Sequence, residues 1–204
     1  MSSLEALLDD LARARIGTTF NQFREHGPDD LPGAARIRLA NLRRYLAERA
    51  AADVVAIGEA AGYQGMRWTG IAFTSEFDLL RWGAPYQRTS LRPRPWKEPS
   101  GTIVHGLLAE RQAERRVILW NVVPTHPHEA VRPLSNRLPT RAEVEAGLGF
   151  THRLLQVLGR DRMVVAIGKV AAIALGDLVT GGVVRHPANA GATRFRREMA
   201  ALLT

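Results

Sequence analysis

Runs of apolar residues mark three predicted strands along this chain. The runs cover residues 54–57, 117–123 and 162–167, and a short fourth strand is expected at 183–184. The longer runs are apolar almost throughout, which is the pattern of strands that are buried on both faces of a parallel sheet. Helical segments between them call for right-handed crossovers. The order of elements therefore predicts an α/β protein, a three-layer α/β/α sandwich with a central, mainly parallel four-stranded sheet.

Helices are predicted from amphipathic spacing and from capping residues. Residues 34–50 place apolar side chains at helical spacing among arginines that we expect to face solvent. Thr140 and Glu143 have the spacing of a capping box, which opens a helix that extends to about Leu158. Further helices are expected from Thr74 or Ser75 to about Trp82, and at roughly 101–113, 169–175 and 193–203.

The chain has 204 residues, of which 46% are apolar, and this predicts a single domain over residues 1–204. Residues 1–50 are expected to form a helical N-terminal part, and residues 51–204 the core that bears the motifs. The proline-rich segment 84–100 is interpreted as a loop, because too little apolar sequence precedes it to fold alone. No secretory signal pattern and no run of about 18 apolar residues is found, so we expect no membrane partner and a location in the bacterial cytoplasm or nucleoid.

The chain is strongly basic. Lysine and arginine number 28 against 20 acidic residues, which gives a net charge of +8 and an isoelectric point near 11.0. This balance favours a polyanionic partner by long-range attraction. Lys97 and Lys169 are the only lysines, so an arginine-biased composition is the simpler alternative. Arginine is nevertheless the better residue for bidentate phosphate contacts.

Neither a metal site nor a cofactor is predicted. The chain has no cysteine, which excludes disulfides, thiolate-held zinc and thiolate-held iron–sulfur clusters. His126, His128 and Glu129 are spaced too closely among prolines to form a metal site, and no further ligand pattern accompanies them.

Polar side chains follow three of the predicted strands. Gly58-Glu59-Ala60-Ala61-Gly62 comes directly after the first strand, Asn121 lies near the end of the second, and His186 follows the last. In an open α/β sheet, ligands bind beyond the carboxyl ends of the strands. We therefore expect a carboxylate, a carboxamide and an imidazole to converge on one site, with Gly168 at the same edge.

Each of these residues also has an ordinary structural interpretation. Glu59 resembles a helix-capping or salt-bridged acid, although Gly58 and Gly62 permit a positive φ and the close backbone approach that a ligand-cradling turn needs. Asn121 fits a turn cap equally well, yet its amide donates and accepts side by side, which matches the edge of a pyrimidine such as uracil.

The same holds for the remaining candidates. His186 with Pro187 fits a plain turn, whereas a neutral imidazole there would donate to an oxygen that gains charge. Phe73 fits the core or a stacking platform for a base. Gly168 opens a short helix whose backbone donors would suit a phosphate.

In their order along the chain, these motifs resemble those of the uracil-DNA glycosylase superfamily, from about Val54 to Leu203. Gly58-Glu59-Ala60-Ala61-Gly62 is similar to the Gly-Glu-Ala-Pro-Gly loop of the family-four bacterial and archaeal type, and Gly70-Ile71-Ala72-Phe73 to its Gly-x-Pro-Phe. Asn121-Val122-Val123 resembles Asn-Val-Val, His186-Pro187-Ala188 resembles His-Pro-Ser, and Gly168-Lys169-Val170-Ala171 resembles Gly-x-x-Ala.

The chain departs from the family-four pattern at several positions. Ala61 replaces proline, Gly65 stands where that branch carries a second acid, and Ala188 replaces serine. The cysteines of the family-four iron–sulfur cluster are absent as well. The resemblance therefore implies a member without the cluster.

The resemblance implies a monofunctional base-excision repair enzyme. It would flip uracil out of single- or double-stranded DNA and hydrolyse the N-glycosidic bond, leaving free uracil and an abasic site. Glu59 and His186 would be catalytic, with Glu59 acting on water and the cationic sugar and His186 on the uracil oxyanion. The uracil-binding residues would be Gly58, Ala60, Phe73 and Asn121.

The resemblance also assigns the DNA contacts. Residues 189–194 would form a wedge that fills the vacated stack. Arg196 and Arg197 would contact phosphates or face solvent. The enzyme is expected to be a monomer, as is usual for compact glycosylases of this kind. The DNA-binding residues would be Gly168, Lys169, Arg185, Asn189 and Arg194.

Three alternatives stay open. A glycosylase for hypoxanthine or xanthine would use the same site, and Tyr63, Gln64 or Arg67 would widen or narrow its pocket. A non-catalytic nucleic-acid-binding protein on the same fold would bind DNA with steep salt dependence but release no base. A small α/β hydrolase or transferase would act on free nucleotides without needing a duplex.

Overall fold

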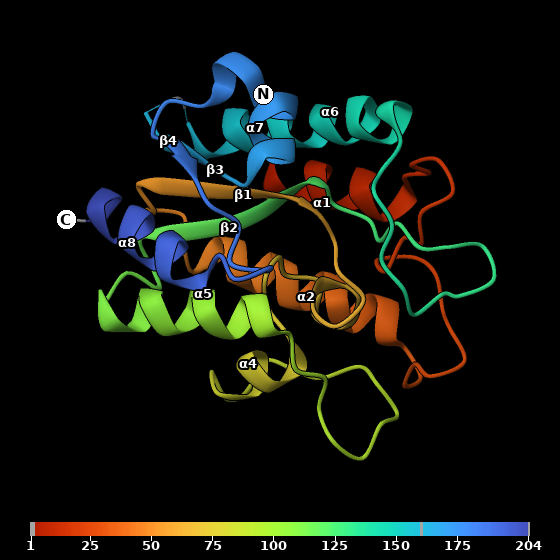
Figure 1. Cartoon of the computed structure of the whole chain (residues 1–204). Helices are drawn as coiled ribbons and strands as arrows, with labels where there is room; N and C mark the ends of the chain where they lie inside the picture. Colours follow the sequence, from red (N-terminus) through yellow and green to blue (C-terminus); the bar gives the residue numbers. More distant parts are fainter. Residues whose placement is uncertain (1–2, 160, 204) are drawn as a thin grey trace.

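A computed structural model describes residues 3–159 and 161–203 of the chain. Its centre is a sheet of four parallel strands in the order β2-β1-β3-β4 (Figure 1). The strands are β1 (Val54–Ala60), β2 (Val117–Val123), β3 (Met163–Ile167) and β4 (Gly182–Val184). The predicted four-stranded sheet is thereby confirmed, and it is parallel throughout.

Helices cover both faces of this sheet, as predicted for a three-layer sandwich. In Figure 1, α6 (Arg141–Leu158) and α7 (Lys169–Leu175) lie on one face, while α2 (Ala34–Ala47), α5 (Pro99–Glu110) and α8 (Ala192–Leu202) lie on the other. Helix α1 (Leu4–Arg13) contacts both α2 and α6. The shorter elements are α3 (Met66–Thr69), α4 (Glu76–Leu80) and the 3₁₀ helix η1 (Gly176–Leu178).

Local capping sets the helix boundaries. The predicted capping box is present, with the Thr140 hydroxyl accepting from the Glu143 N–H and the Glu143 carboxylate accepting from the Thr140 N–H. Ser75 caps α4 in the same way through Asp78. Helix α5 begins at Pro99, two residues before the predicted start at 101, because proline is well suited to the first helical position.

Strand β1 is longer than its apolar run indicates. The prediction ended it at Ile57, but pairing with β2 continues through Gly58↔Asn121 to Ala60↔Val123. Pairing with β3 stops at Ile57↔Ala166. Glu59 therefore lies on the last part of the strand and not in a loop after it. Pairing with β2 on either side of Glu59 holds its backbone more firmly than a loop would.

The predicted solvent-facing arginines of residues 34–50 include two that are buried, Arg38 and Arg49. Arg49 donates to the carbonyl oxygens of Glu114 and Tyr45. Arg38 forms an ion pair with Asp30 and donates to Thr89 Oγ1 at 3.1 Å and to the Gln22 carbonyl at 3.0 Å. Arg67 contacts the same oxygen, Asp30 Oδ1, at 3.1 Å. The expectation was wrong for Arg38, because Asp30, just before the start of α2, neutralises its charge inside the protein.

The open edge of the sheet at β2 is protected by α2. The buried Tyr45 hydroxyl donates to the Val117 carbonyl at 3.4 Å and accepts from the Leu119 N–H at 2.8 Å. A strand edge with free polar groups invites pairing with other chains, and this contact blocks it. Within residues 3–159 and 161–203, no helix combines the length and apolar character needed to cross a membrane.

Candidate active site

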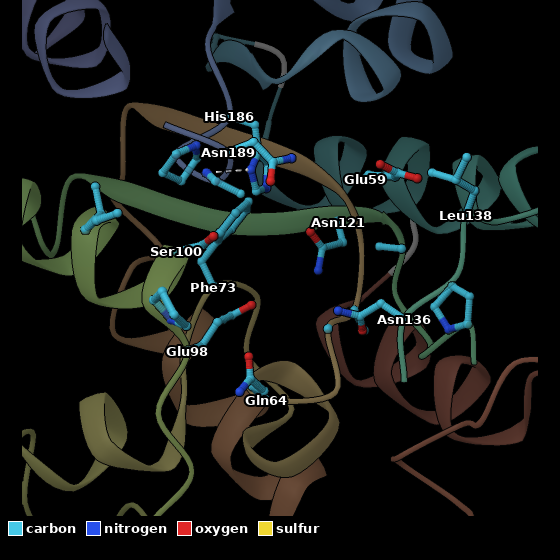
Figure 2. Close-up of a pocket in the computed structure, with 18 of the residues that line it drawn as sticks. Glu59, Gln64, Phe73, Glu98, Ser100, Asn121, Asn136, Leu138, His186 and Asn189 are labelled. Atoms are coloured by element: carbon cyan, nitrogen blue, oxygen red, sulfur yellow. Dashed lines mark hydrogen bonds between the residues drawn. The ribbon is translucent and has the colours of Figure 1, made fainter. Parts of the chain in front are cut away.

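A cleft of about 780 Å³ opens at the carboxyl end of the sheet. Its walls come from β1, the segment after α3, the start of α5, the end of β2, the loop before α6 and the turn after β4 (Figure 2). The lining residues that carry chemistry are Glu59, Gln64, Phe73, Glu98, Ser100, Asn121, Asn136, Arg137, His186 and Asn189. The structure thus brings Glu59, Asn121 and His186 to one cavity from three distant segments.

Phe73 supplies an apolar face to this cleft. The residue is only 7% exposed and has a φ of 51°, which is unusual for a bulky side chain. Its ring lies 5.8 Å from the His186 ring, centroid to centroid, and is tilted by 42°. Backbone strain of this kind persists where the surrounding structure holds it, often at binding sites.

Gly58 lies beneath Phe73 and is not part of the cleft surface. A Cβ at this position would come 2.5 Å from Cζ of Phe73 and 2.7 Å from Oδ1 of Asn121. Neither Gly58 nor Gly62 has a positive φ, so the predicted reason for these glycines was wrong in part. At Gly58 the requirement is space for two neighbouring side chains.

Asn121 presents an amide at the end of β2. The side chain is buried, with 3% of the residue exposed. Its Nδ2 donates to Met66 Sδ at 3.3 Å, and sulfur is a weak acceptor. The amide therefore has hydrogen-bonding capacity left for a ligand in the cleft.

His186 is held in a defined tautomer. Its Nδ1 accepts from the Ala188 N–H at 3.1 Å, so the proton of the neutral ring is on Nε2. Burial, and then the positive charge of Arg185, lower the pKa of His186 below its usual value. A neutral imidazole with a free Nε2–H is the form that can donate to an oxygen atom.

Glu59 lies on the Leu138 side of the cleft in Figure 2. The side chain is half-buried, and burial raises its pKa above the ordinary 4.5. Desolvation disfavours the charged form and makes the carboxylate a stronger base than one in water. A carboxylate in this state can polarise a water molecule or stabilise a positive centre.

The turn after β4 completes the mouth of the cleft. Asn189 and Ala190 have φ values of 52° and 59°, so two non-glycine residues in succession are left-handed. Gly191 follows, and a Cβ there would overlap the His186 carbonyl oxygen. The turn is therefore closely packed against the residue that carries the imidazole.

A basic groove adjoins the cleft. It has a volume of about 510 Å³, and its lining includes Gly168, Lys169, Arg185 and Arg194. A Cβ at Gly168 would lie 3.2 Å from Cβ of His186, so the two hollows share a wall. Four of the five predicted DNA-binding residues meet in this groove, and the fifth, Asn189, lines the cleft.

The contacts in this groove refine the predicted roles. The Gly168 N–H already donates to the Val184 carbonyl at 2.8 Å, so any phosphate would need the N–H groups that follow it. Glu198 accepts from Arg194 Nε at 2.5 Å and from the Arg185 N–H at 2.7 Å. Arg196 pairs with Glu110 of α5, which is a contact between helices.

Several residues of the cleft were not singled out from the sequence. Glu98, Ser100, Asn136 and Leu138 come from segments that lie outside the predicted strands and carry no motif. The Glu98-Pro99 pair was the one available signal, since it marks a helix start. Arg67, which was considered as a pocket residue, instead points to Asp30 and stacks on Phe20 at 3.9 Å.

The histidines of the loop after β2 have structural partners. His126 Nδ1 lies 2.8 Å from the Ala61 carbonyl oxygen, and its Nε2 lies 3.2 Å from that of Pro133. His128 Nδ1 lies 3.0 Å from the Glu129 carbonyl oxygen. In the described part of the chain, no group of three or more histidine or acidic residues is placed to hold a metal ion.

Together, the fold and the cleft define an α/β protein whose site, at the carboxyl edge of a parallel sheet, suits a planar base beside a phosphate chain. The family model of the uracil DNA glycosylase superfamily matches residues 47–202. The chain belongs to this superfamily, and the resemblance seen in its motifs is confirmed.

A solved structure with the same fold is the crystal structure of wild-type SMUG2 from Pedobacter heparinus. It matches with a TM-score of 0.66 and 14% sequence identity, over 98% of this chain and 97% of that chain. No curated protein matches the chain in sequence. Membership of the superfamily supports glycosylase chemistry on DNA, the reaction class of base excision repair.

Proposed function

We propose that this protein is a monofunctional DNA glycosylase that hydrolyses the N-glycosidic bond of uracil in single- or double-stranded DNA. The products are free uracil and an abasic site. The observation that carries the proposal is the convergence of Glu59, Phe73, Asn121 and His186 on one cleft. It supplies an acid, a stacking ring, a base-reading amide and a neutral imidazole, which are the groups that this reaction needs.

The reaction begins with the base turned out of the duplex into the cleft. Phe73 stacks on the base, and the Asn121 amide bonds to the donor and acceptor atoms on its edge. The N-glycosidic bond breaks with its electron pair moving to the base, which leaves negative charge on the uracil and positive charge on the sugar. The Nε2–H of His186 donates to the uracil oxygen that gains this charge.

Glu59 acts on the sugar side of the broken bond. Its ionised carboxylate stabilises the positive charge at C1′ and orients a water molecule, whose oxygen bonds to C1′. The proton that the water loses balances the charge on the departing base. Because burial raises the pKa of Glu59, activity is lost at low pH as this carboxyl group becomes protonated.

The DNA backbone runs along the basic groove in this proposal. Lys169, Arg185 and Arg194 contact phosphates, and the turn at Asn189 enters the space that the flipped nucleotide leaves. In this proposal the protein acts as a monomer, as is usual for compact glycosylases of this kind.

The test is an excision assay on oligonucleotides that carry one uracil, in single-stranded and duplex form. Glu59→Gln and His186→Ala are each expected to lower kcat by about 10²–10³-fold, as for removal of one preorganised donor. Full activity in both variants would contradict the assigned site.

Matched controls are Glu145→Gln, whose carboxylate pairs with the exposed Arg141, and His152→Ala on the exposed face of α6. Both should excise uracil at the wild-type rate. Parallel substrates with hypoxanthine and xanthine identify the base. Binding without release of any base would instead indicate a non-catalytic protein, and turnover of free nucleotides alone would indicate a different hydrolase.

A further inference from the structure

Glu98 places a second carboxyl group in the cleft, from a segment that the mechanism above does not use. It lines the cavity near Gln64 and Ser100 (Figure 2). Glu98 is also the N-cap of α5, a position whose side chain often accepts from the first N–H groups of a helix. Its side chain makes no such capping bond, so the carboxyl group is available to the cavity.

This carboxyl group fills space that two glycines leave open. A Cβ at Gly65 would overlap Oε2 of Glu98, and one at Gly62 would lie 3.0 Å from Oε1. A side chain at position 65 would therefore displace the carboxyl group from its present place. Gly62 and Gly65 thus leave the space that the Glu98 carboxyl group occupies, although the glycines and Glu98 come from two different segments.

The position of Glu98 is fixed relative to the stacking ring. The first turn of α5 packs on the backbone of Phe73, since a Cβ at Gly101 would lie 2.5 Å from the Phe73 carbonyl oxygen. Glu98 immediately precedes this turn. Phe73 and Glu98 therefore line the same cleft from adjoining segments.

Glu98 has an oxygen without a partner. Its Oε2 is inaccessible to solvent and makes no hydrogen bond within the described residues, so Oε1 is the oxygen that is left to face the cavity. A buried carboxylate in this state is unfavourable and takes up a proton instead. Burial, and then the negative charge of Asp78, raise the pKa of Glu98 to about 7.

The other titratable groups around the cleft leave Glu98 without a cation. Asp78 on α4 is acidic, as is Glu59 on β1. Burial lowers the pKa of His105 on α5 to about 4, and His186 also has a lowered pKa, so both rings are neutral at neutral pH. Arg137 also lines the cleft, but it is paired with Glu143. Among the described residues, burial and Asp78 shift the pKa of Glu98, and no cation contributes.

We propose that Glu98 is a base-reading residue whose protonated carboxyl group donates a hydrogen bond to an exocyclic carbonyl oxygen of the flipped base. The inference rests on the proposed glycosylase function and names its substrate class. Deamination replaces an exocyclic amino group with a carbonyl oxygen. A neutral carboxyl group donates to that oxygen, whereas an ionised one only accepts. Glu98 thus favours deaminated bases, and it adds a second polar contact to that of Asn121.

The test is the pH dependence of kcat/KM for uracil excision, measured from about pH 5 to pH 9. Wild-type kcat/KM should fall above about pH 7 as Glu98 loses its proton. In Glu98→Gln this alkaline fall should disappear, because the amide keeps a donor at every pH. Glu98→Ala has no donor and should be about 10- to 100-fold slower at pH 6.

A neighbouring variant tests the same group without changing it. Asp78→Asn removes the negative charge that raises the pKa of Glu98, so the alkaline fall should move to lower pH. The control is Glu110→Gln, at the exposed far end of α5, which should keep the wild-type profile. Thermal unfolding of each variant confirms that it is folded.

The outcomes separate this inference from the proposed function. An alkaline fall that persists unchanged in Glu98→Gln, or wild-type kcat/KM in Glu98→Ala at pH about 6, overturns the role of Glu98 while uracil excision still stands. Absence of base release by the wild-type protein from uracil, hypoxanthine and xanthine substrates overturns both.

Discussion

Gly58 controls the position of two side chains of the cleft through its lack of a side chain. The ring of Phe73 and the amide of Asn121 both occupy the space that a Cβ would need. Protein interiors are close-packed, so even one methyl group at this point has to displace a neighbour. The sequence indicated that a glycine beside Glu59 was significant, but it did not reveal which side chains would use the space.

The first residue-scale prediction concerns Gly58→Ala. The added methyl group should displace Phe73 and Asn121 and lower kcat/KM for uracil excision by about 10²-fold, since small misplacements of binding groups are costly. Overpacking should also destabilise the protein by about 1–3 kcal/mol. Excision kinetics and urea unfolding measure the two effects.

Gly149→Ala is the matched control for this change. Gly149 lies inside α6, and a Cβ there meets nothing within 4 Å. Alanine has the better helix propensity, so this variant should be more stable by up to about 1 kcal/mol and fully active. Wild-type excision by Gly58→Ala would show that the packing beneath Phe73 is unimportant for the reaction.

At the scale of elements, Glu143 holds the loop before α6 in place. Its fully buried carboxylate accepts from Arg137 at 2.7 Å, from the Thr140 N–H at 2.8 Å and from the Thr18 N–H at 3.2 Å. Arg137 lines the cleft. The capping box was predicted from sequence, but its links to Arg137 and to the N-terminal segment depend on tertiary structure.

The element-scale prediction follows from the pKa of Glu143. Hydrogen bonding to Arg137 lowers it from 4.5 to about 2. A lowered pKa stabilises the folded state above the unfolded value of about 4.5, and this contribution is lost as the pH falls from there towards 2. Glu143→Gln should therefore lower the free energy of unfolding by about 2 kcal/mol at neutral pH, because charged hydrogen bonds are removed.

Urea unfolding from neutral to acidic pH tests this assignment. The difference in unfolding free energy between wild type and Glu143→Gln should shrink below about pH 4.5. Glu145→Gln, with its exposed partner Arg141, should change the unfolding free energy by less than about 0.5 kcal/mol. A Glu143→Gln difference that stays constant with pH would rule out the carboxylate as its cause.

At the scale of the whole molecule, the net charge of +8 favours DNA binding. The basic groove is the proposed surface for it. We predict that DNA affinity falls steeply with salt, and that Lys169→Ala and Arg185→Ala each reduce the slope of log K against log salt by about 1. Fluorescence anisotropy with a labelled oligonucleotide at several salt concentrations measures these slopes.

Arg116→Ala removes the same charge at the opposite end of the sheet. Arg116 precedes β2 and pairs with Asp53 before β1, so it lies away from the groove. The slope of log K against log salt for Arg116→Ala should equal that of the wild type. Equal slopes for Lys169→Ala and Arg116→Ala would indicate that only net charge matters and that the groove is not the DNA-binding surface.

The sequence alone determined the layers of the fold and the edge at which the site lies. Strands buried on both faces need apolar residues throughout, and parallel strands bring their carboxyl ends to one edge, so Glu59, Asn121 and His186 were placed there from their order along the chain. Only the tertiary structure decided which other groups reach them. Glu98 reaches the cleft from a loop, and Arg38 and Glu143 find their partners in other segments. Such placements depend on packing in space, which local pattern does not encode.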